Sequence, residues 1–276
     1  MSMLGTQRSL HQRTIPLSHF LQLTKASRSV TFLDFVVGYL IALPVTDYVS
    51  HLPMLVAIFV AFAIFLYSGL YILNDLIDLR EDRRHPIKRE RPLASGKIQP
   101  TSAGAIAILL IVVGLALGYS IGPVVLAFEA GFVLINLLYS IVLKRIPFLD
   151  LFGNTVTHPM RTIFAICVFG QLEPRHWPII SGISIIWLLF TTQKRYKELI
   201  EKSSPSPVPL SRYSRGGLLT LMIIGCPVLL SLIFFAASGL DVALIVTGSA
   251  IYLIVLIGFT VPKGRVRRLL DYIHTH

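Results

Sequence analysis

Apolar residues form long continuous runs along this chain, and charged residues collect between the runs. A helix needs about 20 mostly apolar residues to cross a membrane, and a continuous run favours a helix over a strand, whose pattern alternates. The runs of suitable length are Thr31–Asp47, Pro53–Leu73, Ala103–Gly122, Pro123–Leu143, Phe148–Gly170, Trp177–Gln193, Gly216–Ser238 and Asp241–Val261. This pattern predicts an all-α polytopic membrane bundle of about eight transmembrane helices.

Composition and charge support this prediction and add an orientation. The chain is 54% hydrophobic, which is high for a soluble domain of 276 residues. Its net charge of +11 could suggest a nucleic-acid partner, but the charges follow the loops. If the N-terminus is cytoplasmic, 23 of the 25 Lys and Arg residues fall in the segments 1–30, 74–102, 144–147, 194–215 and 262–276. Basic residues concentrate in the cytoplasmic loops of membrane proteins. We therefore expect an integral protein of the plasma (inner) membrane with cytoplasmic termini, and no nucleic-acid partner.

The runs define one transmembrane domain, residues 31–261, between two basic cytoplasmic segments, residues 1–30 and 262–276. The first segment lacks an apolar core followed by a small-residue cleavage site, so we expect no cleavable signal peptide. The stretches "YVSHL", "SIG", "QLEPRH" and "SGL" are short and should be hairpin connections on the opposite side. The two long cytoplasmic loops, 74–102 and 194–215, are the natural places for function.

The first long loop contains an acidic block, which begins the stretch "NDLIDLREDRRHPIKRERPLASG" at residue 74. If the second helix continues past the membrane, Asn74, Asp78 and Asp82 lie four residues apart on one face, and Asp75 joins them. Carboxylates that share a face repel one another unless a cation lies among them. Mg²⁺ prefers oxygen ligands and binds through one or two carboxylates plus substrate phosphates. The block therefore predicts a Mg²⁺ site formed by these four residues, with the three aspartates as catalytic residues.

The basic block that follows predicts phosphate binding. Lys88, Arg89 and Arg91 can hold phosphate oxygens, and Pro86 and Pro92 break the helix and turn the block back toward the aspartates. A solvated loop with incidental charge is the alternative, and it predicts scattered charges. The ordered acidic and basic blocks favour a site for a pyrophosphate-bearing substrate.

These residues resemble the first Asp-rich motif of the UbiA superfamily of intramembrane prenyltransferases, NDxxDxxxD followed by a basic segment with Arg-Pro. The resemblance implies a UbiA-like bundle, Mg²⁺ as cofactor, an isoprenoid lipid substrate, and a soluble or lipid pyrophosphate donor. Members commonly have nine spans, whereas eight runs are found in this chain. Membrane lipids are expected partners, and an oligomer is compatible with the sequence.

The second long loop distinguishes branches of that superfamily. Members usually carry a second Asp-rich motif here, but the loop reads "TTQKRYKELIEKSSPSPVPLSRYS", which contains no aspartate. Its pattern resembles the decaprenyl-phosphate phosphoribosyltransferase branch. That resemblance implies transfer of a 5-phosphoribosyl group from phosphoribosyl pyrophosphate to a polyprenyl phosphate. Lys194 and Arg195 are expected to bind the additional anionic groups, with Glu198 orienting one of them, and Tyr196 is a further expected substrate-binding residue. Three alternatives stay open: ordinary loop charge, a prenyltransferase acting on an aromatic or lipid acceptor, and, more distantly, a transporter.

A polar stripe also runs through the fifth apolar run. Asp150, Asn154, His158 and Arg161 are spaced by four, four and three residues, which places them on one helical face. Charged residues inside a membrane normally face a cavity or a partner. We expect substrate binding from Asp150 and Arg161, joined by Tyr139 and Lys144 from the stretch "YSIVLKR", which resembles the superfamily. A Glu129–Arg161 ion pair is the structural alternative for Arg161, and His158 has no counterpart in the resembled pattern.

Overall fold

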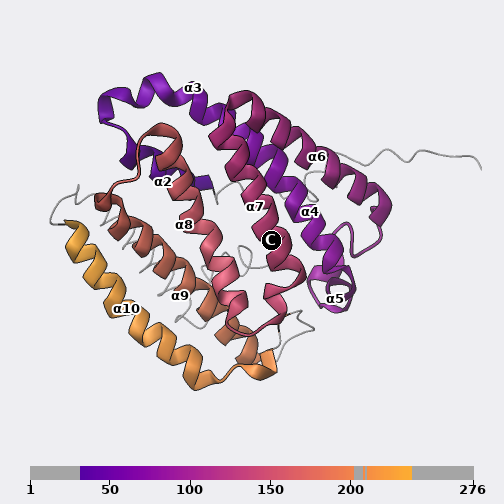
Figure 1. Cartoon of the computed structure of the whole chain (residues 1–276). Helices are drawn as coiled ribbons and strands as arrows, with labels where there is room; N and C mark the ends of the chain where they lie inside the picture. Colours follow the sequence, from indigo (N-terminus) through magenta and orange to yellow (C-terminus); the bar gives the residue numbers. More distant parts are fainter. Residues whose placement is uncertain (1–31, 202–207, 209, 238–276) are drawn as a thin grey trace, which may run out of the picture.

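The computed structural model describes residues 32–201, 208 and 210–237. In this part of the chain the regular elements are all helices, which confirms the predicted all-α fold (Figure 1). The expected terminal segments 1–30 and 262–276, the connection "SGL" and the last apolar run, Asp241–Val261, lie outside the described residues.

The helices follow the apolar runs closely. The α-helices of the described chain are α2 (Leu33–Ala42), α3 (Tyr48–Ile58), α4 (Tyr67–Ile77), α5 (Leu79–Arg84), α6 (Pro100–Ile121), α7 (Pro123–Ile141), α8 (Leu149–Phe169), α9 (Trp177–Glu201) and α10 (Arg215–Ala237). Short 3₁₀ turns are η2 (Val45–Asp47), η4 (Lys88–Glu90), η5 (Leu143–Arg145), η6 (Pro174–His176) and η7 (Leu210–Arg212), and η3 (Phe59–Leu66) is a π-helix.

Three helical stretches of the described chain are long and apolar enough to cross a membrane. They are Val45–Ile77, Pro100–Ile121 and Pro123–Arg145. The first includes "YVSHL", so the predicted hairpin connection there is wrong. The chain turns earlier, because Pro44 disfavours a helical conformation at Leu43, and both residues are extended.

The bundle has two groups of helices that meet at α8. Helix α8 packs against α2 and α9, and α10 packs against α9. On the other side α4 and α6 pack together, α7 contacts both, and α7 also packs against α8 (Figure 1). The ends of α4 and α7 and the start of α8 therefore lie at one end of the bundle. We call it the charged end, because the acidic and basic blocks lie there.

Small residues allow the helices to approach closely. A Cβ atom on Gly38 of α2 would overlap the carbonyl oxygen of Thr162 in α8. A Cβ atom on Gly69 of α4 would lie 2.7 Å from the carbonyl oxygen of Ala107 in α6. Membrane helices are held together largely by such close packing, since lipid removes the hydrophobic driving force.

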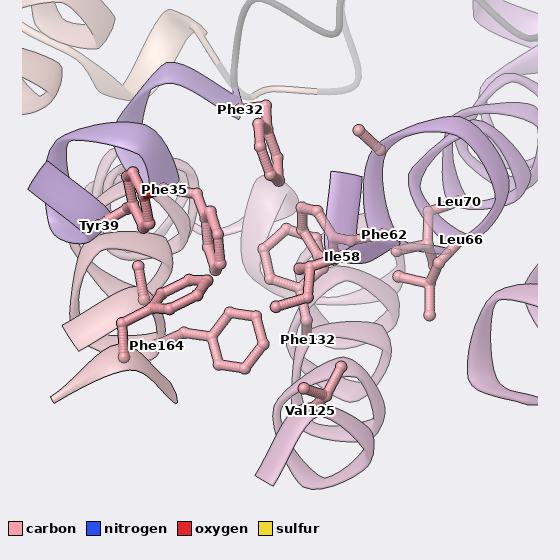
Figure 2. Packing of buried hydrophobic residues seen from close by; sticks show 13 residues of the cluster. Phe32, Phe35, Tyr39, Ile58, Phe62, Leu66, Leu70, Val125, Phe132 and Phe164 are labelled. Atoms are coloured by element: carbon pink, nitrogen blue, oxygen red, sulfur yellow. The ribbon is translucent and has the colours of Figure 1, made fainter. Parts of the chain in front are cut away.

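An aromatic core fills the bundle between α2, η3, α7 and α8. Phe35, Phe62, Phe132 and Phe164 are all buried in it (Figure 2). Phe128 and Phe164 stack in parallel with ring centroids 3.7 Å apart. This apolar packing supports α7 and α8, whose ends carry polar residues at the charged end.

Candidate active site

The second helix bends at the acidic block. Helix α4 ends at Ile77, Asp78 has φ −90° and ψ 4°, and α5 begins at Leu79. The expected unbroken helix through Asp82 is therefore wrong, although the amide of Asp82 still donates to the carbonyl of Asp78 at 2.8 Å. Because of the bend, the aspartates point to different partners instead of forming one column.

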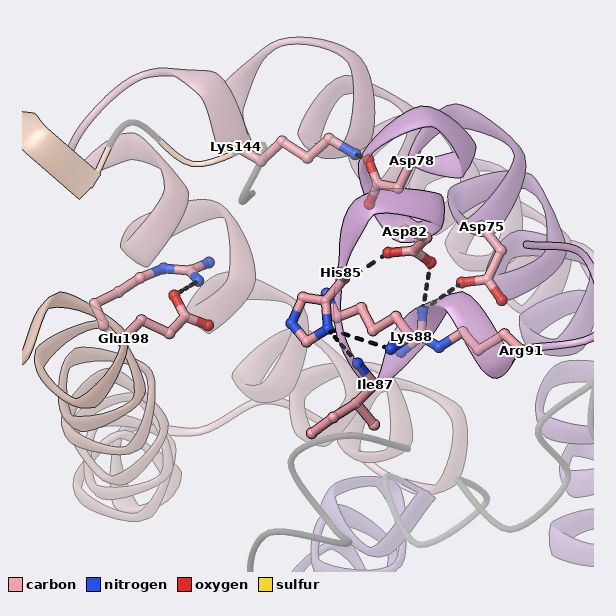
Figure 3. A network of polar contacts seen from close by, with 10 residues as sticks. Asp75, Asp78, Asp82, His85, Ile87, Lys88, Arg91, Lys144 and Glu198 are labelled. Atoms are coloured by element: carbon pink, nitrogen blue, oxygen red, sulfur yellow. Dashed lines mark hydrogen bonds and ion pairs between the residues drawn. The ribbon is translucent and has the colours of Figure 1, made fainter. Parts of the chain in front are cut away.

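Asp75 and Asp82 share the guanidinium of Arg91. The Nη1 atom of Arg91 donates to Asp75 Oδ1 at 3.1 Å and to Asp82 Oδ2 at 2.8 Å (Figure 3). Lys88 Nζ lies 3.8 Å from Asp82 Oδ1. The aspartates are buried, and Arg91 is partly exposed. The basic block thus folds back onto the acidic block, whereas Arg89 from the same block is exposed.

Asp78 and Asn74 face the end of α7 instead. Lys144 donates to Asp78 Oδ1, and Lys144 is only 2% exposed. Ser140 Oγ donates to Asn74 Oδ1 at 3.1 Å. The predicted ligands Asn74 and Asp78 therefore already have partners on α7 and η5.

His85 holds the turn that carries the basic block, and sequence reasoning missed it. Its Nδ1 atom accepts hydrogen bonds from the amides of Ile87 at 3.1 Å and Lys88 at 3.2 Å. Burial, and next the Lys88 charge, lower the pKa of His85, so that the imidazole stays neutral and Nδ1 can accept. Burial also raises the pKa of Asp82, while Arg91 and Lys88 act in the opposite direction. In the sequence, the position of His85 directly before Pro86 could have indicated that its side chain holds this turn.

The oxygens at this site fit Mg²⁺ chemically. Among the described residues, no three His, Cys, Asp or Glu side chains gather closely enough to hold a metal ion. However, Asp75 and Asp82 already place two carboxylates around one cationic nitrogen of Arg91. Two carboxylates completed by phosphate and water oxygens are a usual Mg²⁺ environment. Asp75 and Asp82 are therefore the residues best placed to hold the ion.

A second polar network ties α8 to α9 and to the chain before α10. Arg195 Nε donates to Asp150 Oδ2 at 2.7 Å, and Arg195 Nη1 donates to Glu198 Oε2 at 2.7 Å. The Tyr213 hydroxyl donates to Asp150 and accepts from the amide of Phe148 at 2.7 Å. Burial and the hydrogen bond to Asp150 raise the pKa of Tyr213, so it remains a donor. The expected substrate-binding residues Asp150 and Arg195 are thus bound to each other.

The two polar regions of the charged end are electrostatic neighbours. Burial has the largest effect on the pKa of His85 and on the pKa of Glu198. In addition, the Glu198 charge raises the pKa of His85, and the Lys88 charge lowers the pKa of Glu198 (Figure 3). Tyr139 of α7 lies against Gly153 of α8. The remaining expected residues lie on α9, where Lys194 is partly buried and Tyr196 packs in an apolar cluster with Tyr213.

A polar cluster inside the bundle centres on Asp34 of α2. Asp34 Oδ2 lies 2.6 Å from His158 Nδ1 and accepts from Arg161 Nη1 at 3.1 Å. Asp34 Oδ1 accepts from Trp187 Nε1 at 3.1 Å. Arg161 Nη2 also donates to the Tyr67 hydroxyl at 2.8 Å. The cluster joins α2, α4, α8 and α9 and includes His158 and Trp187, which sequence reasoning did not assign.

The suggested ion pair between Glu129 and Arg161 is wrong. Arg161 pairs with Asp34, and neither carboxylate oxygen of Glu129 has a hydrogen-bond partner in the described part of the chain. Glu129 faces Gly118 of α6, where even a Cβ atom would overlap its carboxylate. Adjacent spans made the Glu129 pair plausible, but the close packing of α2 on α8 brings Asp34 to Arg161.

These features define a class of protein: a helical membrane bundle with paired carboxylates on either side of a helix bend and a basic loop folded over them. The model of the UbiA prenyltransferase family matches residues 35–268, and the chain belongs to this family. The resemblance noted in the acidic block is thereby confirmed.

Curated relatives are similar over part of their length. The chain is 30% identical over 149 residues to the nodulation protein NoeC of Azorhizobium caulinodans, covering 54% of this chain and 47% of that protein. It is 30% identical over 158 residues to the decaprenyl-phosphate phosphoribosyltransferase of Corynebacterium glutamicum, covering 56% of this chain and 47% of that protein. The matches thus span about half the length of these relatives.

Solved structures share the fold. A UbiA homolog from Archaeoglobus fulgidus bound to GPP and Mg²⁺ aligns with a TM-score of 0.69 at 18% identity, over 87% of this chain and 85% of that one. At this identity the similarity concerns the fold, and it agrees with the predicted UbiA-like helical bundle.

Proposed function

We propose that this protein is a Mg²⁺-dependent intramembrane transferase that moves a 5-phosphoribosyl group from phosphoribosyl pyrophosphate to a polyprenyl phosphate. The observation that carries the proposal is the charge layout of the charged end. One carboxylate pair, Asp75 and Asp82, faces Arg91 and Lys88, while α9 contributes Lys194 and Arg195 where a second carboxylate motif is usual. Similarity to a decaprenyl-phosphate phosphoribosyltransferase supports the same choice.

The proposed reaction replaces one C–O bond by another. The bond from ribose C1 to the pyrophosphate oxygen breaks, pyrophosphate leaves with the electron pair, and an oxygen of the polyprenyl phosphate forms the new bond to C1. That acceptor oxygen is already anionic, so it requires no strong general base. A bound Mg²⁺ ion would supply positive charge to the leaving pyrophosphate.

The chain's own residues would position and neutralise the reacting groups. Asp75 and Asp82 would hold the ion, and Arg91 and Lys88 would bind oxygens of the leaving pyrophosphate as its charge develops. Phosphoribosyl pyrophosphate also carries a 5-phosphate, and the acceptor adds another phosphate. Lys194 and Arg195 are proposed to bind these groups, with Glu198 orienting Arg195 through the contact seen at 2.7 Å.

The remaining predicted residues have supporting roles in this proposal. Lys144 would keep Asp78 in place, and Asp150 would hold Arg195 toward the substrate. Tyr139 lies against Gly153 of α8, and Tyr196 of α9 packs in the apolar cluster with Tyr213. Arg161 lies deeper, bound to Asp34, so we propose that it shapes the path of the lipid chain without contacting phosphate.

A transfer assay tests the proposal. The purified full chain in detergent is given Mg²⁺, a polyprenyl phosphate and phosphoribosyl pyrophosphate labelled in the ribose, and label is followed into the lipid phase. We expect transfer that EDTA abolishes and that Asp82→Asn lowers about 10²–10³-fold, since such losses are typical when stabilisation of a developing anion is removed. Glu81→Gln is the matched control, because it removes a neighbouring carboxylate outside the Arg91 contact.

The same assay contains the outcome that would overturn the proposal. If ribose label stays in the aqueous phase while a labelled prenyl diphosphate transfers its prenyl group to an aromatic or lipid acceptor, the protein is a prenyltransferase. The cations on α9 would then be ordinary loop charge.

A further inference from the structure

The cation between Asp75 and Asp82 comes from the protein itself. Arg91 Nη1 lies 3.1 Å from one carboxylate and 2.8 Å from the other, and Lys88 adds a more distant charge at 3.8 Å. Both aspartates are almost fully buried. The guanidinium relieves a repulsion that would be strong at such a site, where screening by water is weak.

Two cations would need the same oxygens. A divalent ion held by Asp75 and Asp82 and the guanidinium of Arg91 would repel each other if both stayed on this carboxylate pair. Arg91 must therefore leave when a metal ion binds, and its N–H groups then require another acceptor. Diphosphate oxygens are suitable acceptors, because a guanidinium binds them through paired hydrogen bonds.

We propose that Arg91 is an exchangeable counter-ion that makes metal binding and diphosphate binding depend on each other. It rests on Asp75 and Asp82 in the substrate-free protein and moves to the diphosphate when the metal ion takes the carboxylates. This inference rests on the proposed function, since it concerns the same site.

The surroundings of Arg91 suit a side chain that moves on a fixed backbone. Its side chain is 18% exposed, against 5% for each aspartate. The carbonyl of Arg91 accepts from the amide of Ser95 at 2.8 Å, and Leu93 is buried in an apolar cluster with Ile72. The exchange thus requires rotation of one accessible side chain and leaves the loop in place.

The exchange has a distinctive signature. In a simple phosphate clamp, neutralising Arg91 weakens diphosphate binding and leaves the affinity for metal alone unchanged. If Arg91 competes with the metal, a neutral residue leaves two carboxylates uncompensated, and metal alone binds more tightly. Coupling between two ligands is reciprocal and typically amounts to about 5–150-fold in affinity.

Binding of Mn²⁺ to the purified full chain tests this without turnover. The protein is titrated with Mn²⁺, with and without inorganic pyrophosphate, and bound ion is measured as loss of the aqueous Mn²⁺ signal in electron paramagnetic resonance. A protein-free titration corrects for Mn²⁺–pyrophosphate complexes in solution. For the wild type we expect pyrophosphate to tighten Mn²⁺ binding about 5–150-fold. For Arg91→Gln we expect tighter binding of Mn²⁺ alone and a smaller effect of pyrophosphate than in the wild type, because only direct coordination by pyrophosphate remains. Arg84→Gln, an exposed site with the same charge change, should behave as the wild type.

The outcomes separate the two proposals. If folded Arg91→Gln binds Mn²⁺ alone no more tightly than the wild type does, the exchange is overturned and the proposed function stands. If the wild type binds no Mn²⁺ even with pyrophosphate, the metal site and the proposed function fail together with the exchange.

Arg91→Lys covers the case in which Arg91→Gln does not fold. A single ammonium bridges the two carboxylates less well than a guanidinium does. The Arg91→Lys variant should therefore bind Mn²⁺ alone more tightly than the wild type, and an unchanged affinity would overturn the exchange.

Discussion

Two buried carboxylate sites in this bundle differ in where their cations come from. At the charged end, Asp75 and Asp82 share Arg91, which belongs to a loop and is 18% exposed. Inside the bundle, Asp34 contacts His158 of α8 and accepts from Arg161 of α8 and Trp187 of α9, and Arg161 is fully buried. The cation of the first site is thus partly exposed to solvent, whereas that of the second is enclosed by helices.

The difference separates a site suited to ligand exchange from one suited to holding helices together. A buried charge that loses its partner retains the full cost of leaving water. At the charged end, the proposed exchange avoids that cost, because a metal ion would replace the guanidinium on the buried carboxylates and phosphate would accept the guanidinium. At Asp34 every partner belongs to a packed helix, so the cluster fixes how α2, α8 and α9 lie together.

The largest expected effect comes from breaking the inner cluster. Asp34→Ala leaves Arg161 buried without its carboxylate and should lower the free energy of unfolding by about 3–5 kcal/mol, the usual cost of a broken buried ion pair. Reversible unfolding in mixed detergent micelles measures this. Glu90→Ala, at an exposed acidic residue, is the control and should change little. Equal stability of the two variants would show that Arg161 readily finds another partner.

A smaller effect is expected from Lys144, a buried cation of the charged end. Lys144→Met removes the partner of Asp78, which is 15% exposed and can be hydrated in part. We expect a loss of about 1–3 kcal/mol in unfolding free energy, the range for a buried polar group left unsatisfied. The exposed Lys97→Met variant controls for the loss of charge. A loss as large as that of Asp34→Ala would mean that the charged end is as rigid as the inner cluster.

The sequence could predict features that lipid and hydropathy dictate. The apolar run Phe148–Gly170 gave the bounds of α8 almost residue by residue, because a membrane helix must bury its own backbone polar groups. Hydropathy did not predict that α9 continues beyond Gln193 to Glu201, because the last turns of this helix are polar. Contacts such as that of Arg195 with Glu198 hold these turns.

The residues that form the site could be predicted from the sequence, but the ion pairs among them were harder to predict. The acidic and basic blocks were recognisable from residue type and spacing, and their contact follows from the turn at Pro86. Which cation meets which carboxylate depends on the bend at Asp78, a backbone feature with no clear sequence signal. Likewise, the choice of Asp34 over Glu129 as partner of Arg161 depends on helix packing between residues far apart in the chain.

The smallest effect sharpens the comparison, because it removes one donor from a carboxylate that keeps its contacts with His158 and Arg161. Trp187→Phe retains an aromatic ring against His158, whose ring centroid lies 3.4 Å from that of Trp187, and loses only the Nε1 hydrogen bond to Asp34. A single hydrogen bond contributes about 0.5–1.5 kcal/mol, and we expect a loss of that size in mixed-micelle unfolding. The chain's other tryptophan supplies the control, since Trp177→Phe changes the same group at an exposed position. If Trp187→Phe cost as much as Asp34→Ala, the three side chains that contact Asp34 would act as one unit. A cost near that of Trp177→Phe would instead assign the inner cluster's stability to the ion pair with Arg161.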